Sequence, residues 1–149
     1  MALHYRVIFG DAQSMPELPD ESVHLVVTSP PYFNAPFDYP DLFPSYEAYL
    51  RTMEKVAKEV FRVLKVGRVA CVVCDDVLVD GERYPIVADM TRLFMDAGFR
   101  YRDRIVWLKP EGYIRISRRQ RRPVAASLPA LFLPRQCSGE RADFSERAV

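Results

Sequence analysis

The sequence contains few of the residues that stabilise small secreted domains or bind metal ions. Among its 149 residues there are three cysteines, two histidines and six glycines. So few cysteines, odd in number, exclude a disulfide scaffold and favour the reducing cytoplasm. No apolar run approaches the ~18–20 residues that a membrane span requires, and no charged-then-apolar leader opens the chain. The composition predicts one soluble globular domain without a membrane segment or a metal site.

Charge is distributed unevenly along the chain, although the formal net charge is only +1. Residues 1–99 carry nine basic and 15 acidic side chains, whereas residues 100–122 carry nine basic and two acidic ones. Five arginines fall within residues 115–122. A run of this kind is typical of a solvated loop or of a surface that contacts nucleic-acid phosphates.

Hydrophobic periodicity alternates between strands and helices along most of the chain. Apolar runs predict four strands, over residues 5–9, 23–28, 68–74 and 101–108. Amphipathic patterns predict one helix capped by Ser45 and ended by Gly67, and a second that begins at Pro85 and ends at Gly98. The alternation predicts an α/β domain with a mostly parallel sheet and helices on its faces.

This arrangement places polar loops at one edge of the sheet, where ligands bind in such folds. They are Asp11, the loop after Thr28, and Asp75 with Asp76. The loop Thr28-Ser29-Pro30-Pro31-Tyr32 is unusual, because two successive prolines fix φ and leave carbonyls that can only accept hydrogen bonds. Such a loop could hold an exocyclic amino group while the tyrosine ring stacks on a flat heterocycle. A proline-rich turn that packs an aromatic side chain is the alternative explanation.

Three stretches of the chain resemble the DNA methyltransferases that modify exocyclic amines, the N4-cytosine and N6-adenine enzymes whose catalytic half precedes the cofactor half. They are VIFGDAQSMPELPDESVHLVVTSPPY, EVFRVLKVGRVACVVCDD and GFRYRDRIVWLKPEGYIRISRR, within about residues 5–119. The resemblance implies a Rossmann-like, S-adenosylmethionine-dependent methyltransferase fold with an incomplete, mostly parallel sheet. It also implies methyl transfer from S-adenosylmethionine directly to the amine of cytosine (N4) or adenine (N6) in DNA.

The resemblance assigns roles to individual residues. Ser29 and the Pro30 carbonyl would hold the target amine, and Pro31 would keep the loop rigid. Tyr32 would stack on the flipped base. Asp11 falls where the family contacts the amino group of the cofactor's adenine, and Ser29 is also expected beside the cofactor. Asp11 can alternatively be an ordinary turn residue. Serine rather than aspartate at the head of the loop favours cytosine as the target.

The same resemblance implies that the basic stretch contacts DNA. It follows a strand that the family directs toward DNA, so we favour DNA contact over a solvated loop. The residues expected to contact DNA phosphates are Lys109, Arg115, Arg118 and Arg119.

The chain departs from the family pattern in two places. It lacks a glycine-rich loop of the FxGxG kind, which in the family holds the methionine part of the cofactor. The pattern also stops near Arg119, so we expect a catalytic half over residues 1–119. A divergent, disordered tail over 120–149 is then expected, and a frameshift is our hypothesis for its origin.

A catalytic half contains only part of the sheet, so we expect an exposed hydrophobic edge where partner strands are lacking. Besides DNA, the expected partners are a second copy of the chain or a complementing methylase half. A catalytically inactive DNA-binding or interaction module is the alternative function.

Overall fold

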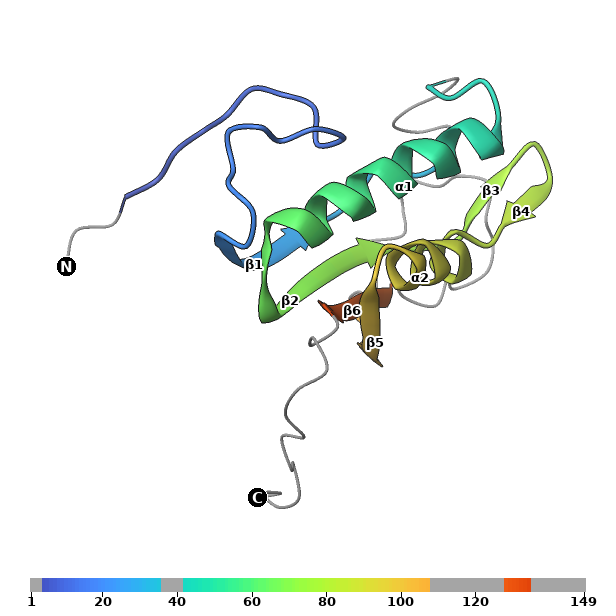
Figure 1. Cartoon of the computed structure of the whole chain (residues 1–149). Coiled ribbons are helices and arrows are strands. Elements are labelled where there is room, and N and C mark those ends of the chain that lie inside the picture. The colour runs from blue at the N-terminus through green and yellow to red at the C-terminus, as the bar shows by residue number, and fades with distance from the viewer. Residues whose placement is uncertain (1–3, 36–41, 108–127, 135–149) are drawn as a thin grey trace, which may run out of the picture.

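The computed structural model describes residues 4–35 and 42–107, and the backbone of residues 128–134. Figure 1 shows a sheet with two helices packed against it and a small hairpin to one side. The elements, in chain order, are β1 (Val23–Thr28), α1 (Tyr46–Val63), β2 (Leu64–Cys74), β3 (Val77–Val79), β4 (Glu82–Tyr84), α2 (Ile86–Asp96), β5 (Phe99–Arg104) and β6 (Leu128–Pro134).

The main sheet has the strand order β1–β2–β6–β5. β1 and β2 are parallel, with Leu25 beside Val69 and Val27 beside Cys71. β6 is antiparallel to both of its neighbours, so β5 runs in the same direction as β2. The predicted α/β class with a mostly parallel sheet is therefore confirmed, with one reversed strand inside it.

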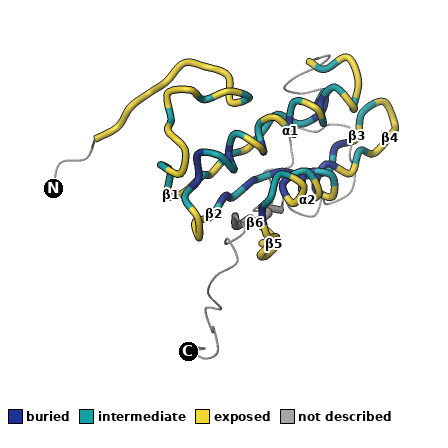
Figure 2. The backbone as a smooth tube through the Cα atoms, viewed as in Figure 1, coloured by how far each residue is buried: buried dark blue, intermediate teal, exposed yellow. Residues whose placement is uncertain are grey.

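Both helices lie over one face of the sheet and share its core (Figure 2). β2 contributes Ala70, Val72 and Cys74, which are fully buried. Burial of a large apolar side chain stabilises the fold by roughly 1.5–3 kcal/mol, so the apolar layer between the sheet and the helices stabilises the fold. The buried residues of the helices are Tyr49, Met53, Ala57, Val60 and Val63 in α1, and Ile86, Val87, Met90 and Phe94 in α2.

The predicted starts of both helices are confirmed. The Ser45 hydroxyl accepts a hydrogen bond from the Ala48 N–H at 3.1 Å and caps α1. α2 begins after Pro85, and Gly98, with φ +115°, follows its end. The prediction that Gly67 ends the first helix is wrong. α1 stops at Val63, because Leu64 is already extended, and Gly67 (φ +75°) lies inside β2 where its register with β1 is irregular.

The strand predicted over residues 5–9 does not form, and this part of the chain pairs with no strand in the described structure. The Tyr5 and Phe9 side chains are 89% and 95% exposed. Residues with high strand propensity form a strand only where a neighbour supplies hydrogen-bond partners and a surface to pack on. The strand predicted over 101–108 is instead β5, which begins at Phe99 and ends at Arg104.

Residues 128–134 lie within the stretch expected to be a disordered tail, and they form β6 between β2 and β5. Its two prolines are each paired on one side only. Pro129 is opposite Val73 of β2, and Pro134 is opposite Phe99 of β5. Proline cannot donate to a ladder, so a position with one neighbour is where a strand tolerates it. The rest of residues 120–149 lies outside the described residues.

The other face of the sheet is bare at β1. Leu25 and Val27 point away from the helices and are 59% and 65% exposed, whereas Val26 between them packs against the core. Within the described residues β1 is also an edge strand, which confirms there the exposed hydrophobic edge expected from the sequence. In the described part of the chain, neither helix has the length and apolar character needed to cross a membrane.

Candidate functional site

The proline loop begins at the carboxyl end of β1, where the sequence predicted it. Ser29 is exposed, whereas Pro30, Pro31 and Tyr32 are half-buried. The chain that follows is anchored, because Phe33 is only 6% exposed and Ala35 is fully buried. The loop therefore presents the Ser29 side chain to solvent from a fixed base, which suits a group that must meet an incoming substrate.

Asn34 fixes the exit of this loop. Its side-chain amide donates to the Phe43 carbonyl and its side-chain oxygen accepts from the Phe43 N–H, both at 2.7 Å. The residue has φ +38°, a left-handed conformation that asparagine tolerates better than most side chains. This paired contact ties the loop to the segment that leads into α1. No local signal in the sequence marks Asn34 for this role.

An aromatic cluster lies behind the loop. The Phe33 ring meets Tyr46 and Tyr84 edge-on, with ring centroids 5.2 and 4.7 Å apart. Tyr32 also packs against the core, and it is half-buried. The proline loop therefore packs an aromatic side chain against the core, as expected of a proline-rich turn, while Ser29 remains accessible.

Burial and hydrogen bonding change the acidity of two tyrosines in this cluster. Burial, followed by the hydrogen bond from its hydroxyl to Asp89 Oδ2 at 2.7 Å, raises the pKa of Tyr46 well above its usual value. Burial, together with the nearby Cys74, also raises the pKa of Tyr49. Both phenols remain protonated at neutral pH, so neither is a general base.

Asp75 and Asp76 follow β2 at the same edge of the sheet as the proline loop. Asp76 Oδ1 accepts a hydrogen bond from the Val87 N–H at 3.1 Å, which satisfies a free donor in the first turn of α2. The Asp76 N–H in turn donates to Asp75 Oδ1 at 2.8 Å. Asp76 therefore holds the start of α2, which explains an acidic residue at this strand end.

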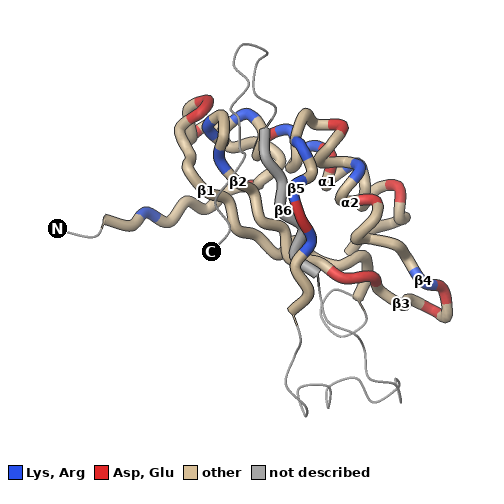
Figure 3. The backbone as a smooth tube through the Cα atoms, turned by 90° about the horizontal axis from the view of Figure 1, so that it is seen from below, with Lys and Arg blue, Asp and Glu red and all other residues tan. Residues whose placement is uncertain are grey.

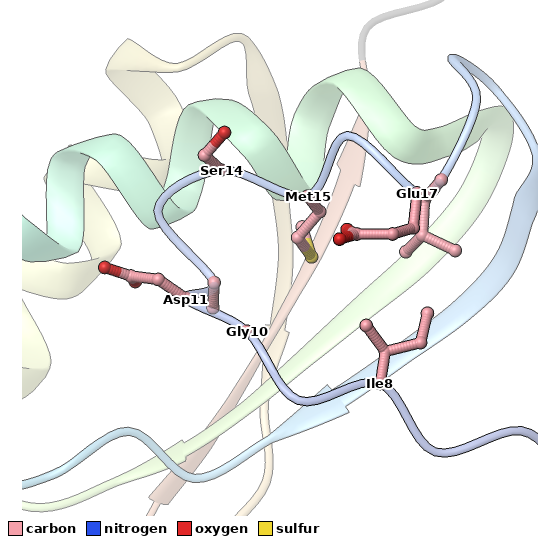
Figure 4. Close-up of a pocket in the computed structure, with 8 residues that line it drawn as sticks. Ile8, Gly10, Asp11, Ser14, Met15 and Glu17 are labelled. Atoms are coloured by element: carbon pink, nitrogen blue, oxygen red, sulfur yellow. The ribbon is translucent and has the colours of Figure 1, made fainter.

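Asp11 lies beside a separate pocket of about 180 Å³. Figure 4 shows Met15 and Glu17 near Ile8, while the Asp11 carboxylate extends from the other end of the loop. The Asp11 carboxylate accepts hydrogen bonds from Gln13, at 2.9 Å from its N–H and at 2.8 Å from its side-chain amide. Asp11 is therefore an exposed turn residue that also lines a cavity. The lining residues are Ile8, Gly10, Asp11, Ala12, Ser14, Met15, Glu17 and Leu18, and they do not include the proline loop.

The end of α1 holds the loop that forms this pocket. Glu59 and Arg62, one turn apart, reach back to residues 15–20. Nothing in the local sequence signals these contacts, because the partners are more than forty positions apart. Glu59 and Arg62 are therefore the main candidate residues that the sequence did not predict.

The basic residues expected on DNA lie outside the described residues: Lys109, Arg115, Arg118 and Arg119. β5, which leads toward them, is already strongly charged, with Arg100, Arg102, Asp103 and Arg104 exposed (Figure 3). An edge strand with such side chains resists pairing with other chains, and its arginines are available to phosphates.

Cys71 and Cys74 do not form a metal site. Both are free, and they occupy β2 with Cys74 facing the core and Cys71 on the opposite, half-buried face. Burial, with a smaller effect from the charges of Asp75 and Asp76, raises the pKa of Cys74 to about 12. This thiol is therefore no nucleophile at neutral pH. Among the residues that the structure describes, no group of histidine, cysteine and acidic side chains could hold a metal ion.

Comparison with known proteins decides the family. The family model of the DNA methylases, which covers N6 and N4 methyltransferases, matches residues 23–129. The chain belongs to this family. The match contains the proline loop and extends into the stretch predicted to diverge, up to the first residues of β6.

Curated relatives of this methylase chain are type II methyltransferases. M.MjaVI from Methanocaldococcus jannaschii is 38% identical over 98 residues, which are 61% of this chain and 47% of that protein. M.BglII from Bacillus subtilis is 36% identical over 109 residues, which are 72% of this chain and 30% of that protein. The methylase chain spans about half the length of M.MjaVI and 30% of the length of M.BglII.

Solved structures agree with the fold. A DNA modification methylase from Thermus thermophilus, determined in complex with S-adenosyl-L-methionine, superposes with a TM-score of 0.63 at 28% identity. The superposition covers 91% of this chain and 57% of that one. The cytosine-N4-specific PvuII DNA methyltransferase superposes with a TM-score of 0.57 at 20% identity, over 83% of this chain and 46% of that one. The fold is the Rossmann-like methyltransferase fold, present here as an incomplete sheet.

Proposed function

We propose that this chain is the catalytic half of a DNA amino-methyltransferase, which transfers a methyl group to the exocyclic amine of cytosine (N4) or adenine (N6). The observation that carries the proposal is the loop of residues 28–32. It lies at the carboxyl end of β1, in a family that methylates DNA, with Ser29 exposed on a rigid and anchored base. Serine at the head of this loop favours cytosine.

The residues beside Asp11 fit one part of S-adenosylmethionine. A pocket of about 180 Å³ is smaller than the roughly 300–1,000 Å³ of sites that enclose a whole ligand. Its apolar members Ile8, Met15 and Leu18, with the carboxylates of Asp11 and Glu17, suit a flat ring that bears an amino group. Asp11 is our candidate to accept a hydrogen bond from the adenine amine. The sequence offers no glycine-rich loop for the rest of the cofactor.

The proline loop performs the chemistry in this proposal. S-adenosylmethionine, when bound, supplies a methyl group activated by a sulfonium centre. The Ser29 hydroxyl and the Pro30 carbonyl accept hydrogen bonds from the target amine and turn its lone pair toward the methyl carbon. Pro31 limits the movement of these acceptors, and Tyr32 provides the ring on which a flipped base stacks. With the cofactor bound, the amine nitrogen would bond to the methyl carbon as that carbon's bond to sulfur breaks, which leaves a neutral thioether. The proton then lost from the nitrogen would pass to water.

DNA and a complementary protein surface are the proposed partners. Lys109, Arg115, Arg118 and Arg119 are our candidates for phosphate contacts, continuing the exposed arginines of β5. The bare side of β1, with Leu25 and Val27, is our candidate surface for a complementing methylase half. A second copy of the chain is the other candidate partner for this surface of β1. Two free cysteines and a DNA substrate fit the cytoplasm as its location.

Nucleoside mass spectrometry tests the proposal. Unmethylated DNA is incubated with the purified chain and S-adenosylmethionine, and the digest is examined for N4-methylcytosine and N6-methyladenine. Either base supports the proposal and identifies the target, and Ser29→Ala should then reduce methyl transfer by about 100-fold or more. His24→Ala, an exposed change on β1 itself, is the matched control and should retain activity.

An inactive DNA-binding or interaction module is the second candidate function, favoured by the absence of a glycine-rich loop. A folded chain that binds DNA but produces neither methylated base would support this second function. DNA binding should survive Ser29→Ala under either function, so the presence or absence of methyl transfer by the wild type separates the two.

A further inference from the structure

The loop between Asp11 and β1 has little structure of its own. Within it the Ser14 N–H donates to the Asp11 carbonyl and the Leu18 N–H to the Met15 carbonyl, both at 3.0 Å. Residues 11–22 belong to no helix and to no strand. Isolated turns of this kind are marginal in water, so contacts from elsewhere must determine the shape of the loop.

Arg62, at the end of α1, supplies such contacts. Its Nη2 donates to the Met15 carbonyl at 2.9 Å, and its Nη1 donates to the Leu18 carbonyl at 3.0 Å. The same Nη1 lies 2.6 Å from Asp20 Oδ1. The planar guanidinium holds these acceptors in a fixed relation, which an ammonium on a flexible stem cannot do.

Glu59 completes the arrangement from the preceding turn of α1. Its Oε2 accepts from the Met15 N–H at 2.8 Å and from Arg62 Nη2 at 2.9 Å, while its Oε1 accepts from Arg62 Nε at 3.0 Å. Met15 is therefore held at both its N–H and its carbonyl. The backbone continues the contact, because the Glu21 N–H donates to the Arg62 carbonyl and the Ser22 N–H to the Val63 carbonyl, at 2.9 Å each.

Two of the residues that Arg62 holds, Met15 and Leu18, line the same pocket as Asp11. The other ion pairs of α1 differ in this respect. Arg51 with Glu47, and Lys58 with Glu54, are exposed pairs within the helix surface. Arg62 and Glu59 are less exposed, at 30% and 21% of their side chains, and they connect the helix to the pocket wall.

We propose that Glu59 and Arg62 are positioning residues that hold the loop of Asp11 in the shape that binds the adenine part of S-adenosylmethionine. The inference rests on the proposed cofactor site and names the residues that preorganise it. Neither side chain lines the pocket itself. Glu59 and Arg62 act through Met15 and Leu18. Replacement of the Glu59 or the Arg62 side chain should therefore weaken cofactor binding without removing a group that touches the cofactor.

The test is the dissociation constant of S-adenosylmethionine, measured by calorimetry with the full chain at 25 °C. We expect Arg62→Gln to raise it by about tenfold or more, because displaced binding groups lose much of their effect. Arg62→Lys keeps the charge but not the planar fork, so it should give an intermediate loss. Lys58→Gln removes an exposed cation from the same helix and should change the constant by less than about twofold.

Two further variants separate positioning from general destabilisation. Met90→Ala opens a cavity in the core under α2, away from the loop, and should lower the melting temperature without altering cofactor affinity. Amide hydrogen exchange should accelerate at Ser14 and Leu18 in Arg62→Gln and remain slow there in Met90→Ala.

The outcomes distinguish the inference from the function on which it rests. Faster exchange in Arg62→Gln with an unchanged dissociation constant would mean that the contacts only stabilise the loop, and the inference would be wrong. A wild-type chain that does not bind S-adenosylmethionine, or that binds it equally well after Asp11→Ala, would overturn the proposed cofactor site and the inference together.

Discussion

The hydroxyl of Tyr46 lies 2.7 Å from Asp89 Oδ2 and donates a hydrogen bond that joins the first turns of α1 and α2. Tyr46→Phe leaves the ring in the aromatic cluster but removes this donor. We expect a loss of about 1–2 kcal/mol in the free energy of unfolding, because the acceptor is a half-buried carboxylate. Chemical denaturation measures it. Tyr84→Phe, which removes an exposed hydrogen bond to Glu82, should cost much less, and equal losses in the two variants would contradict the prediction.

Removal of the Tyr49 hydroxyl should have the opposite effect on stability. Its side chain is fully buried, and within the described part of the chain its hydroxyl has no hydrogen-bond partner. A buried hydroxyl without a partner destabilises a fold, so Tyr49→Phe should leave the free energy of unfolding unchanged or raise it by about 1 kcal/mol. The same denaturation experiment applies. A loss above about 1 kcal/mol would show that the hydroxyl has a partner in the protein.

Glu59 should make stability depend on acid pH. Its hydrogen bonds from Arg62 and from the Met15 N–H lower the pKa of its carboxyl from 4.5 to about 2. A carboxyl whose pKa is lower in the folded state stabilises the protein fully above its unfolded pKa and less as the pH falls. The contribution of Glu59 should therefore be constant above about pH 5 and decline between about pH 4.5 and 2. Denaturation curves across this range should show a smaller decline for Glu59→Gln than for the control Glu47→Gln.

Gly98 should be intolerant of any side chain. Its φ of +115° is unfavourable for other residues, and an added Cβ would lie 2.9 Å from two atoms of the Phe61 ring. Gly98→Ala should reduce the free energy of unfolding by about 1–3 kcal/mol. Gly81 is the matched control, because it also has positive φ (+87°) but open space around its Cβ position. A loss no larger than that of Gly81→Ala would show that the contact with Phe61 adds nothing.

Local signals in the sequence predicted much of the fold. Ser45 is a capping residue followed by an amphipathic run, and Pro85 and Gly98 mark the ends of a second one, so both helices could be placed. β1 was predicted because its apolar run is short and bounded by turns. The run over residues 5–9 has the same signals but no partner, and partners are not encoded locally.

β6 could not be predicted for the opposite reason. Its residues, LPALFLP, contain two prolines and no alternation, and only the gap between β2 and β5 makes them a strand. At the site, the proline loop was visible because its chemistry lies in consecutive residues. The contacts of Glu59 and Arg62 join segments that are distant in sequence, so only the folded chain reveals them.

The place of β6 in the sheet has a consequence for how the chain folds as it leaves the ribosome. β5 is synthesised before β6, yet its hydrogen-bonded neighbour in the sheet is β6 and not β2. A nascent chain can complete the parallel pair of β1 and β2 under α1 early, because these elements are adjacent in sequence. β5 must then wait until residues 128–134 have emerged and entered the gap from the opposite direction. A ribosome that stalls before this point holds a chain whose sheet is divided in two.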